Sequence, residues 1–411
     1  QLLKRFMSTS LKQRIYYCGM VNTGRYSAMI RQPLHIGAAA NKMIAVVRAI
    51  RDAEADGYLV SMPVLGSSSS RSGVSAVVLK QGNCPQLFLP TVANRFVRKI
   101  YALLSFGWFC LFVVKRTDRV ILYNHAFEYL LGLIVLNLRG KRPILDVEDA
   151  ARFDEPGWRG FLGALLFRLF WRMTSPAKLI VSEALANALG LTKYCVVYGA
   201  VRQASGSGDL PCEQPSFRPA PGEPFRIHFG GSLCTDTGID LFCAAVDLLL
   251  KAVPESDLSV EFVVTGFGAE EKVRQLVERC GNSWVRVVFY PDLSPSQYRE
   301  HFRRCHAALS LKLPDSDMGM TTFPSKVVEI TSQGLLLIST RASDVPVLFD
   351  DGNAILLAEA SPSALADAVV SVLNDLPGAQ EKAQRGHLRA LELFESRRVG
   401  KRIVDFVFNV A

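Results

Sequence analysis

The chain has 411 residues, of which 49% are hydrophobic, and a formal net charge of +9. This length exceeds what one hydrophobic core usually supports, so two domains of roughly 200 residues are expected, and the composition excludes a disordered chain. Its nine cysteines are scattered without a Cys-x-x-Cys pair. That pattern disfavours a disulfide framework and a zinc site, and it predicts a reducing, cytoplasmic setting.

The charge is shared unequally between the two halves of the chain. Residues 1–205 carry 27 Lys and Arg against 11 Asp and Glu, a net charge of +16, whereas residues 206–411 carry 20 against 27, a net charge of −7. A basic half suggests a polyanionic partner, either an anionic membrane surface or a nucleic acid. Because no helix-turn-helix, zinc-finger or RNA-binding aromatic signature accompanies the charge, we favour the membrane and expect no nucleic-acid partner.

Strands and helices alternate along the first half of the chain, as in a doubly wound α/β domain. Gly37 follows the first strand and precedes an Ala-rich amphipathic helix, either as part of a ligand-binding loop or as a plain tight turn. Strands are predicted at residues 14–20, 58–64, 119–124, 177–182 and 194–198, with another beginning at Pro143.

Two helices of this half have an ambiguous environment. Residues 98–116 place a largely apolar run of fifteen residues between two pairs of basic residues. A membrane-spanning helix needs about 20, so this segment is either a buried crossover helix or a helix lying in the membrane interface. Residues 157–173 interleave two Trp with three Arg, which is typical of an interfacial anchor or of an amphipathic helix packed on the sheet with its arginines extended into solvent.

Polar residues follow two of the predicted strands. Asn124 and His125 lie at the end of strand 119–124, and Asp146, Glu148 and Asp149 lie at the end of the next strand. Ligands of open α/β sheets bind beyond the carboxyl ends of strands, although a lone His is often structural. The three carboxylates could pair with Arg, orient acceptor hydroxyls or bind a metal.

Residues 203–224 contain five prolines with Gly and Ser, and we interpret them as the interdomain linker. The second half then opens with a strand that ends in Gly230, Gly231 and Ser232, before Gly238 and a helix. A later strand ends in Gly266 and Gly268. Such glycine-rich turns can hold phosphate with their backbone N–H groups.

Residues 321–340 are the most informative stretch. Pro324 and Ser325 predict a helix start, Gly334 predicts its end, and an apolar strand follows at residues 335–338. Lys326 and Glu329 share one face of this helix beside an N-terminus that attracts anions. The arrangement suits a phosphorylated, hydroxyl-rich ligand, although an exposed ion pair would have the same spacing.

The segment Phe-Pro-Ser-Lys-x-x-Glu, followed by Gly and an apolar strand, resembles the donor-binding segment of GT-B glycosyltransferases, particularly family 4. The resemblance extends from about residue 225 to 375 and implies two Rossmann-like, doubly wound domains facing a central cleft. Residues 1–202 would bind the acceptor and residues 225–380 a nucleotide sugar. Residues 381–411 would return as helices towards the first domain.

The resemblance also implies roles for individual residues. Lys326 and the helix N-terminus would face the diphosphate, Glu329 would hold the ribose, and His125 would orient the donor sugar. The acceptor would lie near Gly37, Asn124, Asp146, Glu148 and Asp149. The remaining donor-binding residues would be Gly230, Gly231, Ser232, Gly238, Gly266, Gly268, Thr321, Thr322, Phe323, Pro324 and Ser325. No metal or other cofactor is expected, because these enzymes generally bind the diphosphate without one.

The resemblance predicts a retaining glycosyltransferase that moves a sugar, such as a hexose, to a saccharide or lipid-linked saccharide in bacterial surface-polysaccharide assembly. The enzyme would be cytoplasmic or peripheral on the inner face of the membrane. However, many relatives carry Arg, Lys and Glu where this chain has Ser232, Thr237 and Thr321. A non-catalytic sugar-nucleotide-binding subunit and a GT-B epimerase therefore remain alternatives.

Overall fold

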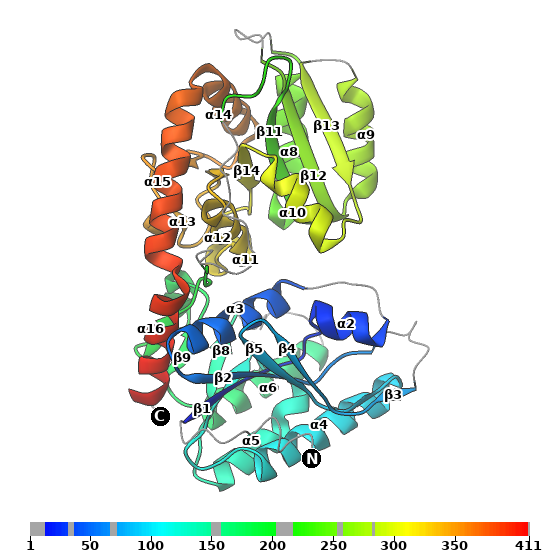
Figure 1. The fold of residues 1–411 in the computed structure, drawn as a ribbon, viewed down its shortest axis with the longest axis vertical. Coiled ribbons are helices and arrows are strands. Elements are labelled where there is room, and N and C mark those ends of the chain that lie inside the picture. Colours follow the sequence, from blue (N-terminus) through cyan, green and yellow to red (C-terminus); the bar gives the residue numbers. More distant parts are fainter. Residues whose placement is uncertain are drawn as a thin grey trace. The chain divides into compact units, whose positions relative to one another are not determined.

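A computed structural model describes residues 13–31, 37–65, 72–148, 158–202, 217–252, 258–281 and 284–409 (Figure 1). The chain divides into two compact units. The first comprises Gln1–Arg202 and Glu395–Ala411, and the second comprises Gln203–Phe394. The chain therefore passes between the units after Arg202 and again after Phe394.

The first unit is built on a sheet of eight described strands in the order β10-β9-β8-β7-β1-β2-β5-β4. The neighbouring strands are parallel except for the antiparallel pair β4 and β5. The strands are β1 (Arg14–Gly19), β2 (Asp56–Ser61), β4 (Val77–Gln81), β5 (Cys84–Phe88), β7 (Arg119–Tyr123), β8 (Ile144–Val147), β9 (Lys178–Ile180) and β10 (Tyr194–Val196), with a separate pair β3 (Gly73–Val74) and β6 (Thr91–Val92). The strand order reverses between β1 and β7, which is where doubly wound folds bind ligands.

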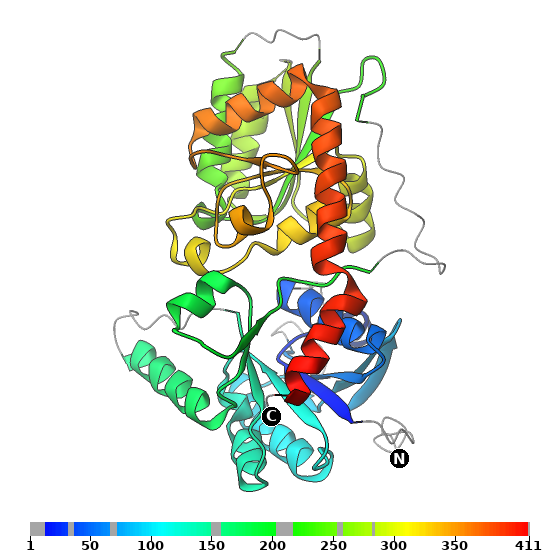
Figure 2. The ribbon, with the colours of Figure 1, turned by 90° about the vertical axis from the view of Figure 1, so that its left-hand side faces the viewer.

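Helices cover both faces of this sheet because alternate residues of a strand point to opposite sides. Ile15 and Tyr17 of β1 share a core with α3 and α16, whereas the ring of Tyr16 lies 5.3 Å from that of Phe109 in α4. The helices are α2 (Gly24–Ile30), α3 (Ala38–Asp52), α4 (Arg95–Phe112), the 3-10 turn η1 (Phe127–Tyr129), α5 (Leu130–Leu138), α6 (Trp158–Met173), α7 (Glu183–Ala188) and α16 (Ser396–Asn409). The last of these lies alongside α3 (Figure 2).

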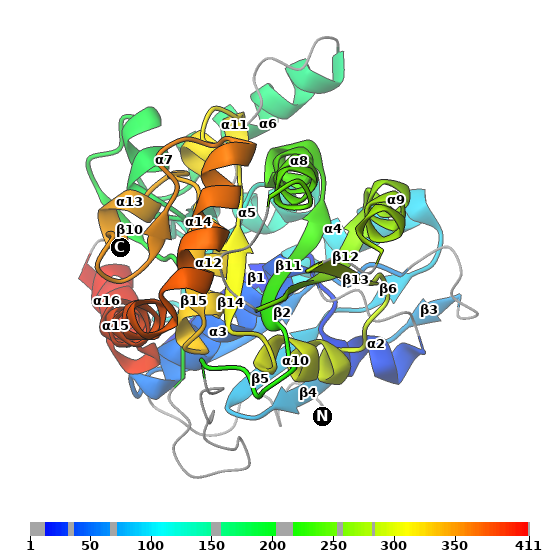
Figure 3. The same cartoon turned by 90° about the horizontal axis from the view of Figure 1, so that it is seen from above.

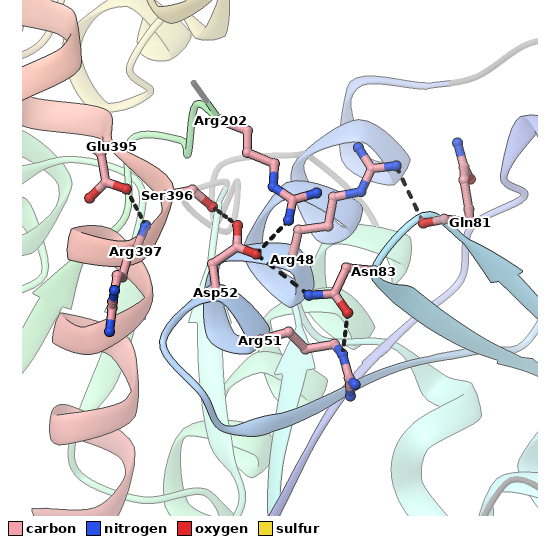
Figure 4. Close-up of polar contacts among 9 residues, drawn as sticks. All are labelled: Arg48, Arg51, Asp52, Gln81, Asn83, Arg202, Glu395, Ser396 and Arg397. Carbon is pink, nitrogen blue, oxygen red and sulfur yellow. Dashed lines mark hydrogen bonds and ion pairs between the residues drawn. The ribbon is translucent and has the colours of Figure 1, made fainter. Parts of the chain in front are cut away.

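Both passages of the chain out of the first unit are tied to the end of α3 (Figure 4). Asp52 accepts hydrogen bonds from Arg202 at 2.9 Å and from the hydroxyl of Ser396 at 2.7 Å. The side chain of Asn83 approaches the same carboxylate at 3.5 Å. The backbone N–H of Ser396 also donates to the carbonyl of Val201 at 2.7 Å. The Asp52 carboxylate thus binds both Arg202 and Ser396, residues that lie where the chain leaves and re-enters the first unit.

The second unit contains one sheet of described parallel strands in the order β13-β12-β11-β14-β15-β16. These are β11 (Phe225–Leu233), β12 (Val260–Gly268), β13 (Val285–Tyr290), β14 (Ala307–Ser310), β15 (Leu336–Ser339) and β16 (Ile355–Leu356). The helical elements are η2 (Thr235–Thr237), α8 (Ile239–Leu249), α9 (Glu270–Cys280), α10 (Pro295–Arg303), α11 (Asp317–Thr321), α12 (Ser325–Ser332), α13 (Val345–Leu348), α14 (Pro362–Asn374) and α15 (Leu376–Phe394). The order reverses between β11 and β14, so a second ligand-binding crevice is expected there.

The core of this unit lies between the sheet and α8, α9 and α14. Phe225, Ile227 and Phe229 of β11 point into it. His228 points to the opposite face, where its ring lies 4.9 Å from that of Phe302 in α10. Helices α8 and α9 therefore cover one face and α10 the other (Figure 3). Helix α15 also belongs here, because it packs on α12 and β15 and its Phe394 ring lies 6.5 Å from Phe323.

Candidate functional site

The C-terminal ends of the parallel strands β11 and β12 lie side by side and are rich in glycine, and we call Gly230–Ser232 with Gly266 and Gly268 the glycine turn. Gly231 pairs with Gly266, and Leu233 pairs with Gly268. The glycines have φ angles of 109°, 122° and 126°, which L-residues rarely adopt. A Cβ on Gly266 would overlap the carbonyl oxygen of Gly231. Glycine is therefore required at these predicted donor-binding positions by the close approach of the two strands and of Lys326.

Gly230 is fixed by the side chains beneath it. A Cβ there would overlap the hydroxyl of Thr265 and lie 2.8 Å from the His228 ring. His228 is buried and its Nε2 is 2.8 Å from the Thr265 hydroxyl. Burial, together with the nearby charges of Lys326 and His301, holds the pKa of His228 well below its usual range. A neutral imidazole therefore supports the turn.

Helix α12 begins beside this turn. Pro324 occupies the N-cap position with φ −71° and makes no side-chain capping bond. The ring of the preceding residue, Phe323, is buried. The first-turn N–H groups of the helix therefore have no side-chain cap. The helix ends before Gly334, whose φ of 74° suits glycine. Ser325, the first helical residue, is exposed.

The side chain of Lys326 crosses the backbone of Gly231. A Cβ on Gly231 would lie 2.8 Å from Lys326 Cε and 3.4 Å from Nζ. The absence of a side chain at Gly231 is therefore what lets the lysine reach the turn. Burial lowers the pKa of Lys326, and the charge of Glu329 partly opposes that shift. The geometry places an ammonium, a glycine turn and a helix N-terminus together, which can bind an anion.

Tyr298 of α10 was not among the residues predicted from the sequence. It lies close to Glu329, and burial together with the interaction with Glu329 raises the pKa of Tyr298. The tyrosine thus stays protonated and orients a carboxylate that can accept ligand hydroxyls. The sequence places Tyr298 in the first half of a capped helix after Pro291, but this position alone does not predict which residue it contacts.

Ser232, Thr237 and Thr321 are the three residues that depart from the pattern expected from the resemblance. Thr237 bonds the carbonyl of Ser232 at 2.5 Å, so its side chain closes its own turn. Thr321 bonds the carbonyl of Asp317 at 2.8 Å, and the carbonyl of Thr322 accepts from Lys312 at 3.1 Å. Gly238 has φ 82°, and a Cβ there would overlap the carbonyl oxygen of Leu311. These contacts stabilise the loops that surround the glycine turn.

Polar residues also meet at the strand reversal of the first unit. Asn124, with φ 54°, donates its N–H to Asp146 O at 2.8 Å and accepts from Glu148 N at 2.9 Å. Tyr17 donates to one oxygen of Asp146, while the other is buried without a hydrogen-bond partner among the described residues. Burial and the two acidic charges raise the pKa of Tyr17 well above its usual range.

A cation from α3 completes this acidic cluster. Lys42 forms an ion pair with Glu148, and its Nζ lies 3.9 Å from Asp146 Oδ2. Ion pairing was one of the three interpretations of these carboxylates, with Lys42 rather than Arg as the partner. Asp146 is only 1% exposed, so Glu148 is the better candidate for contacting a ligand.

The other predicted residues of the first unit have different surroundings. The His125 ring lies 5.2 Å from Phe167 in an edge-on arrangement and 6.3 Å from Phe170, both in α6. Gly37 is exposed as the N-cap of α3, and nothing within 4 Å would obstruct a side chain there. Asp149 lies outside the described residues. In the part of the chain that the structure describes, no group of His, Cys, Asp and Glu is arranged to hold a metal ion.

Comparison with known proteins finds a family model that matches most of the second unit. Residues 224–375 match a model described as glycosyl transferases group 1. No curated protein matches the chain significantly.

Solved structures match almost the whole chain. Sucrose-phosphate synthase from Thermosynechococcus elongatus is 12% identical, with a TM-score of 0.67 over 97% of this chain and 99% of that one. Anabaena Alr3699/HepE in complex with UDP is 12% identical, with a TM-score of 0.63 over 97% and 100%. The lipopolysaccharide outer core galactosyltransferase WaaB is 16% identical, with a TM-score of 0.59 over 97% and 99%. These similarities show a GT-B fold.

Proposed function

We propose that this chain, which has the GT-B fold and matches the group 1 glycosyl transferase model at residues 224–375, transfers a sugar, with retention, from a nucleotide diphosphate to a saccharide or lipid-linked saccharide. The observation that carries the proposal is the ammonium of Lys326 over the Gly231 turn at the start of α12. HepE, one of the solved relatives, was crystallised with UDP and with UDP-glucose.

The proposed chemistry follows from where charge develops. Breaking the anomeric C–O bond leaves negative charge on the diphosphate, so fixed donors aimed at that group lower the barrier most. Lys326, the N–H groups at Ser325 and the backbone of Gly230 to Ser232 would supply them. Glu329, oriented by Tyr298, would hold the ribose, and His125 would orient the sugar. The acceptor hydroxyl would attack on the face that the leaving group departs from, without an enzyme nucleophile.

The acceptor is assigned to the first unit. Glu148 and the Asn124 loop would bind its hydroxyls at the end of β7 and β8. The net charge of +16 on residues 1–205 favours an acceptor presented at an anionic membrane, with the enzyme peripheral on the cytoplasmic face. A lipid-linked intermediate of surface-polysaccharide assembly has this chemistry.

A thermal-shift screen with UDP, GDP, ADP and CMP tests the donor site. Selective stabilisation by one nucleotide, lost in Glu329→Ala but retained in the control Glu359→Ala, would support it and identify the base. The control carboxylate is exposed and lies before α14. No response to any of the four nucleotides would contradict the proposed site.

We include in the proposal that the diphosphate is neutralised by protein groups rather than by a metal, so EDTA should leave activity unchanged. Loss of activity in EDTA, restored by one divalent ion, would refute this part.

A second candidate is a non-catalytic sugar-nucleotide-binding subunit, favoured by the Thr237 side chain being bonded within its own turn. It would show the same nucleotide stabilisation without sugar transfer. Product analysis without acceptor separates an epimerase, because only that enzyme would alter the nucleotide sugar alone.

A further inference from the structure

Helix α4 carries two apolar faces. Its inner face is buried through Ala102, Phe106, Phe109 and Cys110. Its outer face is exposed and almost wholly apolar: the exposed residues of the helix are Arg95, Phe96, Val97, Lys99, Ile100, Tyr101, Leu104, Trp108, Leu111 and Phe112. Helix α6, the other segment for which the sequence allowed an interfacial position, also exposes apolar side chains, at Phe161, Leu162 and Leu165.

The neighbouring helix α5 also exposes apolar side chains. It packs against α4, and its exposed residues are Ile134 and Leu138, the latter 83% exposed. Scattered apolar side chains are normal on protein surfaces, but a contiguous apolar stripe marks an interaction site. We call the outer faces of α4 and α5 the apolar face. Among the described residues no helix is both long and apolar enough to span a bilayer.

A basic pocket lies where α4 and α5 end. It has a volume of about 810 Å³ and is lined by Arg116, Arg119, Arg139, Lys141 and Arg142, with one acid, Asp118. Arg119 and Ile144 begin β7 and β8, so the pocket is at the edge of the sheet opposite to Asn124 and Glu148. It is therefore separate from the candidate acceptor site.

The cations of the pocket are only partly neutralised. Asp118 accepts a backbone N–H from Lys115 at 2.7 Å, and its carbonyl accepts from Lys141 at 2.5 Å. The buried Nε of Arg119 has no hydrogen-bond partner among the described residues. Burial lowers the pKa of Lys141 to about 8, with Arg119 and Arg139 adding to the shift and Asp118 opposing it. A bound anion would relieve this crowding of like charges.

One contact joins the pocket to the apolar face. Arg139 Nη1 donates to the carbonyl of Cys110 and approaches that of Leu111 at 3.3 Å. The exposed Leu138 and the pocket-lining Arg139 are consecutive, and Phe112 lies four residues before Arg116. Apolar side chains next to phosphate-binding cations match the boundary between acyl chains and headgroups of a bilayer.

From this juxtaposition we propose that the apolar face docks into an anionic bilayer, and that the basic pocket receives the phosphate of a phospholipid headgroup. The inference deepens the proposed function, because it identifies the surface by which the enzyme would reach a lipid-linked acceptor. The membrane is the favoured occupant because the face is bracketed by cations at both ends, at Arg95 and Lys99 and again at Lys115 and Arg116.

Vesicle flotation of the full chain tests the proposal, with phosphatidylcholine vesicles made with and without phosphatidylglycerol. Wild type should bind the anionic vesicles more tightly. Arg116→Gln/Arg142→Gln should lower that affinity about 25-fold, roughly fivefold for each charge removed, and abolish the preference for anionic lipid. Phe96→Ser/Leu104→Ser should lower binding to both kinds of vesicle by more than about tenfold.

Matched controls in the second unit separate surface-specific effects from general ones. Lys251→Gln/Arg303→Gln removes the same charge, and Val347→Ser/Leu388→Ser removes exposed apolar side chains elsewhere. Both should bind vesicles as wild type does. All substituted residues are exposed, so circular dichroism should show folded protein throughout.

Three results would overturn the proposal: no binding to vesicles, no preference for anionic lipid, or equal losses in variants and controls. Dimerisation by analytical ultracentrifugation that Phe96→Ser/Leu104→Ser abolishes, without vesicle binding, would assign the face to a second copy instead. Nucleotide binding is measured separately, so a failure here does not depend on the donor site.

Discussion

Tyr298 lies close enough to Glu329 that burial and the carboxylate together raise the pKa of its hydroxyl, although the two residues belong to different helices, α10 and α12. The tyrosine therefore acts on a ligand through the carboxylate that it orients. We expect Tyr298→Phe to lower nucleotide affinity about fivefold, the usual worth of one hydrogen bond. Isothermal titration with the nucleotide selected by the screen measures this.

A double-mutant cycle supplies the control for that relationship. If Tyr298 works through Glu329, Tyr298→Phe/Glu329→Ala should bind nucleotide no more weakly than Glu329→Ala alone. Additive losses would mean that the tyrosine contacts the ligand independently.

Adding a single methyl group at Gly231 should distinguish an effect on nucleotide binding from an effect on stability. Gly231→Ala introduces strain at φ 109° and forces Lys326 aside, because the new Cβ would be 2.8 Å from its Cε. Gly222→Ala is the matched control: its φ is 82°, and nothing lies within 4 Å.

Both glycine variants should lose about 1–2 kcal/mol of unfolding free energy. Only Gly231→Ala should also lose nucleotide-induced stabilisation in the thermal-shift assay. Equal nucleotide responses in the two variants would show that the lysine does not need this approach.

The sequence identified the local parts of the donor site better than its assembled contacts. Lys326, Glu329 and the glycine turns belong to short motifs whose geometry follows from a strand end or a helix start. Tyr298 could not be predicted, because its contact with Glu329 depends on how α10 packs on the sheet. The sequence predicted His228 only as a strand residue, because the residues that surround it belong to other elements.

Elements with weak local signals also differed from expectation. The short helix α11 was not predicted, although Ser316 caps its start by accepting a hydrogen bond from Gly319 N at 3.0 Å. The antiparallel hairpin of β4 and β5 was not predicted, although Gly82 lies at its turn with φ 58°. The helical pattern after residue 376 is continuous, so the sequence alone did not place the passage between units after Phe394.

The environment of α4 needed the structure for a different reason. An apolar run of this length fits both a buried helix and an interfacial one. When both faces of a helix are apolar, the sequence pattern does not show which face is buried and which is exposed. The packing of Phe106 and Phe109 accounts for one face only. The exposure of Phe96, Leu104 and Phe112 identifies the other.

His306 should make the second unit sensitive to acid. It accepts the N–H of Arg226 at 2.8 Å through Nδ1, and burial lowers its pKa from 6.5 to about 4. The unfolded chain then binds more protons than the folded one below about pH 6.5, so stability falls as the pH drops through this window.

The lowered pKa of His306 corresponds to about 3 kcal/mol between pH 6.5 and pH 4. Urea unfolding across this range should give a shallower pH dependence for His306→Gln than for wild type. Identical slopes would show that His306 is not held neutral in the folded protein.

Asp52 should control how firmly α16 is held on the first unit. Asp52→Asn weakens the hydrogen bonds from Arg202 and the buried Ser396, with an expected loss of about 1–2 kcal/mol. Hydrogen exchange of residues 396–409 should become faster. Glu54→Gln is the control at the same junction, since its ion pair with Arg397 is exposed and worth about 0.5 kcal/mol or less. Equal exchange in the two variants would contradict the role of Asp52.

The most direct test of the donor site compares the selected nucleoside diphosphate with its nucleoside by isothermal titration in wild type and Lys326→Gln. If Lys326 faces the diphosphate, the substitution should lower diphosphate affinity about 30-fold and leave nucleoside affinity unchanged. Because burial lowers the pKa of Lys326, wild-type diphosphate affinity should also begin to fall with rising pH before the ordinary lysine value of 10.5 is reached. An unchanged ratio of the two affinities in Lys326→Gln would contradict the account.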